Sequence, residues 1–153
     1  MGRIEKHLET LGLQLPNPPE RAGLYAQTRR MGDGVYVSGC GPDINGISKY
    51  RGRLGVLNVH DGQKAAQQCI LNALAILQRD LGTLDKIKSV VKMLVFVASE
   101  RDFFSQPLVA DGASRLLIDV FGEDHGCPAR SAVGMWVLPG DIPVEIELMA
   151  ELE

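Results

Sequence analysis

Residues 127–148 of this 153-residue chain read CPARSAVGMWVLPGDIPVEIEL. Apolar residues recur at every second position along 133–137, which is typical of a strand with one buried face. Turn formers crowd residues 138–143, and the alternation resumes in residues 144–148. The stretch therefore predicts a β-hairpin with Arg130 at its entrance.

The returning strand of this hairpin carries two carboxylates, Glu145 and Glu147, on one face. A face with two carboxylates is costly to bury unless the charges find partners. It is either a solvated polar face or a face that meets Arg130 or a ligand across the hairpin.

The part of the chain that precedes this hairpin contains one strand-like segment between two helix-like segments. Residues 87–98 are apolar enough for a strand covered on both faces. Helical periodicity over residues 63–81, with Asp61 as a candidate N-cap, predicts one helix. Residues 102–122 predict a second helix, with Pro107 in its first turn or with a start nearer Gly112.

The first half of the chain supplies the remaining strands. Residues 21–41 predict a hairpin that turns at Gly32-Asp33-Gly34. Residues 47–57 predict one more strand, along which Lys49, Arg51 and Arg53 alternate. The sum is an α+β domain with a mixed sheet of about six strands and two helices packed on one face.

Residues 1–20 differ from the rest of the chain. Ile4, Leu8 and Leu11 predict a short helix over residues 2–12, and the prolines of residues 13–20 predict an extended connector. We therefore divide the chain into this N-terminal helix with its connector and a domain over residues 21–153.

Composition narrows the class of protein. The net charge of −3 gives no general attraction to nucleic acid, although Arg29 and Arg30 with the cations of residues 49–53 could cluster for RNA. No apolar run is long enough to span a bilayer, and the first residues do not form a signal peptide. The three cysteines are widely spaced, which favours free thiols and a cytoplasmic location.

Familiar catalytic motifs are missing from the sequence. There is no Gly-x-Ser-x-Gly elbow, no P-loop lysine and no zinc-ligand spacing around His125 and Cys127. We expect neither a metal nor another cofactor.

The pair formed by Pro128-Ala129-Arg130-Ser131 and Val144-Glu145-Ile146-Glu147 resembles the C-terminal signature of the RidA/YjgF family. These proteins are reactive-intermediate deaminases, also called endoribonuclease L-PSP, and the resemblance covers residues 22–152. It implies a homotrimer with a ligand site in each cleft between subunits. It further implies hydrolysis of 2-imino or enamine acids to 2-keto acids and ammonia, without a cofactor.

The resemblance also implies roles for particular residues. Arg130, beside Ser131, matches the arginine that binds a substrate carboxylate, since a guanidinium grips a carboxylate with two parallel hydrogen bonds. Glu145 matches the glutamate that holds or activates water. Tyr25 and the Ser38-Gly39 turn match the remaining substrate-binding positions.

The chain departs from the family pattern at the walls of the expected pocket. Ala132 replaces a usual cysteine, Cys40 replaces a frequent glutamine, and Cys127 stands where a bulky apolar residue is common. Two other functions stay open: a protein that cleaves RNA or inhibits translation, and a non-catalytic trimer that binds a small carboxylate. For Arg130, a salt bridge to Glu145 or Glu147 that only ties subunits together is the structural alternative.

Overall fold

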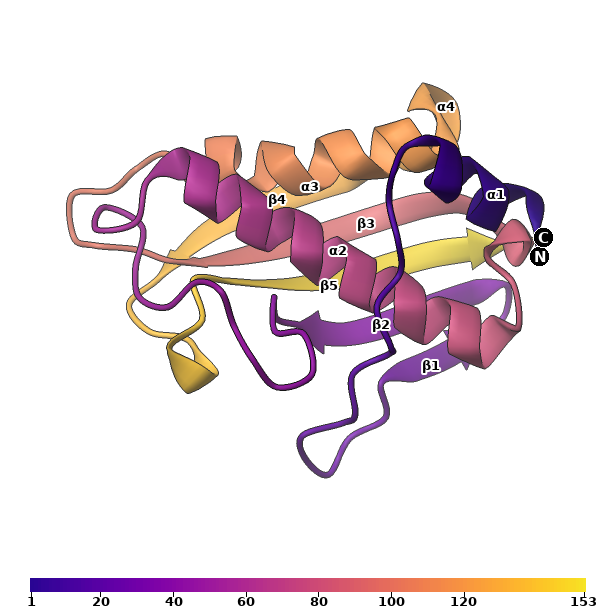
Figure 1. The fold of residues 1–153 in the computed structure, drawn as a ribbon, viewed down its shortest axis with the longest axis horizontal. Helices are drawn as coiled ribbons and strands as arrows, with labels where there is room; N and C mark the ends of the chain where they lie inside the picture. The colour runs from indigo at the N-terminus through magenta and orange to yellow at the C-terminus, as the bar shows by residue number, and fades with distance from the viewer.

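The computed structural model describes residues 1–153 as one mixed sheet with helices on one face (Figure 1). The strands are β1 (Thr28–Met31), β2 (Gly34–Cys40), β3 (Ile87–Ala98), β4 (Ala129–Met135) and β5 (Val144–Leu152). Their order across the sheet is β1-β2-β5-β3-β4, and only the β3–β4 pair is parallel. The predicted α+β class and mixed sheet are confirmed.

The long helices α2 (Val59–Leu81) and α3 (Gln106–Phe121) lie side by side on the same face of the sheet, as predicted (Figure 1). The N-cap of α2 is Asn58, whose side chain accepts a hydrogen bond from the Asp61 backbone N–H at 2.8 Å, so Asp61 is not the cap. The α3 helix has Pro107 in its first turn and includes Gly112, so a start near Gly112 is wrong.

The predicted C-terminal hairpin is wrong. β4 pairs in parallel with β3, whereas β5 is inserted between β2 and β3. The α3 helix and the short α4 (Glu123–Gly126) connect β3 to β4, because parallel neighbours need a crossover rather than a tight turn. The turn-rich segment, with the 3-10 helix η2 (Pro139–Asp141), therefore leads past the end of β3 to reach β5.

The sixth strand predicted over residues 47–57 is also absent, and the sheet has five strands. Gly52 and Gly55 have φ of 98° and 108°, which interrupts extended backbone. The three cations of this segment consequently do not share a face. Arg51 contacts Asp43, and Arg53 contacts Glu100 and stacks on Trp136 at 4.0 Å, so no basic strip forms there.

The N-terminal residues join the same core as the helices. The short helix α1 (Arg3–Thr10) buries Ile4 and Leu8 in the cluster that contains α2, α3 and the helix-facing side of the sheet. The buried Glu5 accepts a hydrogen bond from the Leu84 backbone N–H at 2.8 Å, in the 3-10 helix η1 (Leu84–Lys86). None of the helices is long and apolar enough to span a bilayer.

The other face of the sheet carries no helix (Figure 1). Glu145 and Glu147 of β5 pair with Phe96 and Leu94 of β3, whereas the buried Val144 and Ile146 point into the helix-covered core. Because neighbouring residues of a strand point to opposite faces, the two carboxylates lie on the uncovered face. The predicted common face of the two glutamates is confirmed.

Candidate active site

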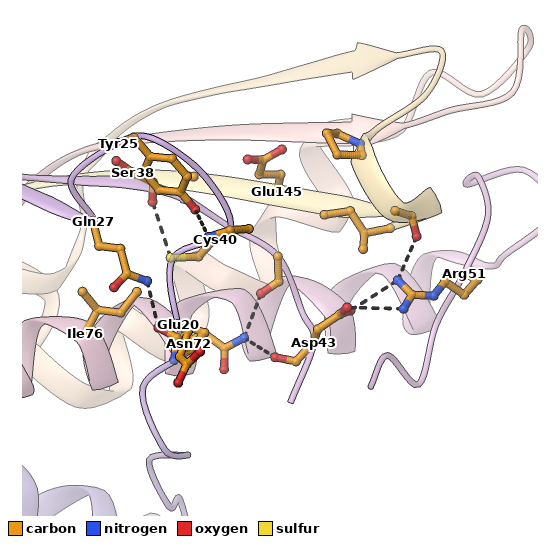
Figure 2. Close-up of a pocket in the computed structure, with 17 residues that line it drawn as sticks. Glu20, Tyr25, Gln27, Ser38, Cys40, Asp43, Arg51, Asn72, Ile76 and Glu145 are labelled. Atoms are coloured by element: carbon orange, nitrogen blue, oxygen red, sulfur yellow. Dashed lines mark hydrogen bonds and ion pairs between the residues drawn. The ribbon is translucent and has the colours of Figure 1, made fainter. Parts of the chain in front are cut away.

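A polar pocket of about 560 Å³ opens between the segment before β1, the end of β2 and the start of β5 (Figure 2). This volume is in the usual range for a small-molecule site. Of the residues predicted for the site, it contains Tyr25, Ser38, Gly39 and Glu145. Sequence positions up to 120 apart are thus brought together by the insertion of β5 next to β2.

Glu145 is a half-buried carboxylate of this pocket. Burial raises the pKa of its carboxyl, and the charge of Glu147 two residues along the same face raises it further. A carboxyl with a raised pKa, placed in a cleft, is suited to exchanging protons with a bound molecule.

Gly39 gives the Glu145 side chain its room. A Cβ built on Gly39 would overlap Glu145 Oε1, so any other residue would force the carboxylate to move. The register between β2 and β5 shifts between Val37 and Cys40, and this bulge lies at Gly39. The glycine is therefore required by space, since its backbone is not in the left-handed region.

Ser38 organises the rim of the pocket. Its hydroxyl donates to the Ala26 carbonyl at 2.7 Å, and its backbone N–H donates to the Gln27 carbonyl at 2.9 Å. These bonds attach the segment before β1 to β2 and place the Tyr25 ring over the pocket (Figure 2). Because the hydroxyl proton of Ser38 is already engaged, this side chain is a positioning group rather than a nucleophile. Tyr25 lies within the predicted 21–41 hairpin, but it precedes β1 and is not part of a strand.

Cys40 forms part of the inner wall. Burial raises the pKa of its thiol to about 12, and the nearby charge of Glu145 acts in the same direction. The thiol is therefore protonated at neutral pH and a poor nucleophile. It donates weakly to the Ser38 carbonyl at 3.4 Å.

The pocket residues that sequence analysis missed include three polar side chains that are linked to one another: Asp43, Arg51 and Asn72. Asn72 is a buried amide on α2 whose side-chain N–H groups donate to the carbonyls of Gly41 and Asp43, at 2.8 and 2.9 Å. Arg51 donates to the Gly140 carbonyl at 2.9 Å and to the Asp43 carboxylate at 3.3 Å (Figure 2). A polar Asn within the apolar helix stripe was the one available signal, because buried amides need partners.

Arg130 and Ser131 lie outside this pocket. Arg130 Nη1 donates to Asp111 Oδ1 at 2.7 Å and to Ser114 Oγ at 3.0 Å, both on α3. No hydrogen bond joins Arg130 to Glu145 or Glu147 within the chain, because β3 separates β4 from β5. Ser131 faces the other side of the sheet, where Lys92 Nζ donates to its hydroxyl at 3.5 Å.

The guanidinium of Arg130 is only partly used. Both of its hydrogen bonds involve Nη1, and neither Nε nor Nη2 donates to a protein acceptor. Two donors of the planar fork are thus available to a carboxylate, while Asp111 and Ser114 fix its orientation. No group of three or more His, Cys, Asp or Glu residues in the structure could hold a metal ion.

The chain matches the model of one protein family. The family model described as "YjgF/chorismate_mutase-like, putative endoribonuclease" matches residues 5–152, and the chain belongs to this family. The predicted resemblance to RidA/YjgF proteins is confirmed.

Similar proteins are known in bacteria and eukaryotes. Protein TCP17 of Trypanosoma cruzi is 42% identical over 154 residues, covering 99% of this chain and 95% of that protein. The crystal structure of Atu1372 from Agrobacterium tumefaciens, of unknown function, has a TM-score of 0.89 and 40% identity and covers 98% of this chain and 92% of its own. A 2-iminobutanoate/2-iminopropanoate deaminase of Dermatophagoides farinae is 28% identical over 142 residues, covering 92% of this chain and 95% of that protein.

Proposed function

We propose that this protein is a hydrolase that deaminates reactive 2-imino or enamine acids, with Glu145 as its proton-handling group. The observation that carries the proposal is the Glu145 carboxyl, which is half-buried in a polar pocket with a raised pKa and a glycine opposite it. The relative from Dermatophagoides farinae, named for 2-iminobutanoate and 2-iminopropanoate, supports this choice of substrate class.

The proposal includes a homotrimer in which each site lies between two copies. Within one chain, Arg130 is on the edge strand β4 and Glu145 is in the pocket on the far side of β3. The helix-free face of the sheet exposes Tyr36, Val133 and Met135, which is an apolar surface suited to a second copy. In this arrangement Arg130 of one copy faces the Glu145 pocket of the next.

The proposed reaction needs only water as co-reactant. Arg130 binds the substrate carboxylate through Nε and Nη2, which places the C=N carbon near Glu145. As water adds to that carbon, the Glu145 carboxylate accepts a proton from it and passes the proton to the imine nitrogen, so that a carbinolamine forms. Glu145 then accepts the hydroxyl proton of the carbinolamine and delivers it to the amino nitrogen, the C–N bond breaks and ammonia leaves as the C=O bond forms. The balance is imino acid plus water to keto acid plus ammonia.

A kinetic assay tests the proposal directly. An L-amino-acid oxidase acting on alanine generates 2-iminopropanoate in solution, and the rate of pyruvate appearance is then followed with and without the protein. We expect acceleration over spontaneous hydrolysis, and sedimentation of a trimer at micromolar concentration. Pyruvate binding without acceleration would instead favour a non-catalytic carboxylate-binding trimer, and a monomer would remove the intersubunit site.

A further inference from the structure

A groove of about 590 Å³, distinct from the Glu145 pocket, lies on the helix-covered side of the molecule. Its walls are the connector after α1, the loop after β2, one flank of α2 and Leu116 of α3. The apolar side chains that line it are Leu13, Pro42, Ile44, Ile47, Leu71 and Leu116.

The loop that forms one wall is built to hold its shape. Asn45 and Gly46 both have positive φ, at 53° and 76°, which is the geometry of a tight type I′ turn. Ile44 and Ile47 flank this turn and exchange two backbone hydrogen bonds, of 2.9 and 3.0 Å. The turn leaves Ile47 75% exposed at the mouth of the groove. A preformed loop that holds an isoleucine in water lowers the entropy cost of binding an apolar molecule.

The charged side chains that line the groove are all positively charged. Lys49 and Lys64 line it, neither forms an ion pair, and no acidic residue is among the lining residues. The amides of Gln67 and Gln68 add further polar groups on the α2 side. An apolar floor with two unpaired cations is complementary to a molecule with one apolar tail and one anionic head.

We propose that this groove binds a single-chain amphiphilic anion, such as a medium-chain carboxylate, with its tail on the isoleucines and its head between Lys49 and Lys64. The site is separate from the Glu145 pocket, although the two share a wall. Residues 41–51 present Gly41, Asp43 and Arg51 to the pocket, and the groove is lined from the same segment by Pro42, Ile44, Ile47, Lys49 and Tyr50. Asn72 holds this wall in place, and Gln68 Nε2 donates to Asn72 Oδ1 at 3.1 Å.

Titration calorimetry with octanoate, decanoate and dodecanoate tests the groove. While the tail fits, each methylene group should tighten binding about fourfold, because its transfer from water is the driving force. Decanol and decyltrimethylammonium should bind at least about tenfold more weakly than decanoate, because they lack the anionic head. Affinity that does not depend on chain length, or equal binding of the three head groups, would overturn the proposal.

Variants locate the binding site on the chain. Lys49→Gln with Lys64→Gln should weaken decanoate binding at least about tenfold, whereas Lys6→Gln with Arg29→Gln, which removes the same charge elsewhere, should leave it unchanged. Ile47→Asp should also abolish binding, and it should fold because the residue is exposed.

A further variant separates the groove from the pocket. Glu145→Gln should leave decanoate binding unchanged, since Glu145 does not line the groove. Loss of decanoate binding in Glu145→Gln, or its retention in the double lysine variant, would place the molecule elsewhere and refute the inference.

Discussion

The Glu145 pocket and the Arg130 cluster are built in opposite ways. Glu145 is half-buried beside a glycine, has no hydrogen-bond partner from the protein and has a raised pKa. Arg130 lies on an edge strand and is fixed by two partners on α3. The first region holds a carboxyl whose pKa is raised by burial, and the second holds a guanidinium with a constant charge and a fixed direction.

Under the proposed function, the two regions divide two tasks between them. Proton exchange benefits from partial burial, because desolvation brings the pKa of a carboxyl closer to neutrality. Anchoring a carboxylate needs rigid geometry, and the α3 partners supply it. Since β3 separates the regions within one chain, the proposed site uses one region from each of two copies.

Removing the proton-exchanging group should have the largest effect. Glu145→Gln is expected to lower kcat for imine hydrolysis by about 10²- to 10⁴-fold, the usual contribution of a general acid or base. The melting temperature should hold or rise at neutral pH. The pKa of the Glu145 carboxyl is higher in the folded than in the unfolded protein, so its protonated form stabilises the fold. This stabilisation is fully present below the unfolded-state pKa and is lost as the pH rises through the folded-state pKa. Activity within tenfold of the wild type would exclude Glu145 as the proton-handling group.

Displacing the Glu145 carboxylate should have the next largest effect on the rate of imine hydrolysis. Gly39→Ala places a Cβ against Glu145 Oε1, and displacement of a reacting group by about 1 Å costs on the order of 10²-fold in rate. Gly23→Ala is the control, because its Cβ would meet only the Tyr25 ring at 3.4 Å. Comparable rates for the two variants, measured in the imine assay, would show that the Glu145 position is not critical.

Changing the anchor should weaken ligand binding. Arg130→Lys keeps the charge but loses the fork, and a charge-assisted hydrogen bond is worth roughly 1.5–3 kcal/mol. Calorimetric affinity for pyruvate or 2-oxobutanoate should fall by about ten- to a hundredfold, with an unchanged melting curve. Unchanged affinity together with a lower melting temperature would assign Arg130 a structural role only.

Weakening the support of Arg130 should reduce ligand affinity less than replacing Arg130 itself. Asp111→Asn removes the ion pair to Arg130 Nη1 but keeps an acceptor oxygen at the same place. Because Asp111 is an exposed partner, we expect the pyruvate dissociation constant to rise by less than about fivefold. Glu100→Gln, which breaks the Arg53 ion pair, is the matched control and should leave the constant unchanged. A loss as large as that of Arg130→Lys would indicate that Asp111 contacts the ligand itself.

The smallest expected effect is a shift in pH dependence. Glu147→Gln removes the neighbouring negative charge that raises the Glu145 pKa, although burial remains the larger cause. The acid limb of the kcat/KM profile should therefore move to lower pH, by less than about one unit. A shift to higher pH, or none, would show that the limb does not report Glu145.

The sequence predicted the periodic elements well and the strand neighbours poorly. Apolar spacing is a local property, so it located α2 and the strand over residues 87–98. The neighbours of β4 and β5 in the sheet are not set by local sequence. Two alternating segments joined by a turn-rich connection have the same sequence pattern whether they form a hairpin or lie on either side of β3. The proline and glycine residues of 138–143 could not distinguish these cases.

The placement of the candidate site was predictable only in part. The family resemblance predicted Glu145, Ser38 and Gly39 as site residues, and the structure places these three in one pocket. It missed Arg51 and Asn72 because their positions depend on a loop without periodic structure, set by glycines at positive φ. It also paired Arg130 with the wrong strand, because the ion pair to Asp111 arises from the crossover through α3.

The position of β5 has a consequence for how the chain acquires its structure during translation. β5 is the last of the five strands of this sheet to be synthesised, yet its neighbours are β2 and β3, which are made long before. Until it arrives, β2 and β3 each present an unpaired edge, and the Glu145 wall of the pocket does not exist. Such edges favour association with other chains. The nascent chain therefore exposes these edges until β5 emerges, and a ribosome stalled after β4 would carry helices that have no complete sheet to cover.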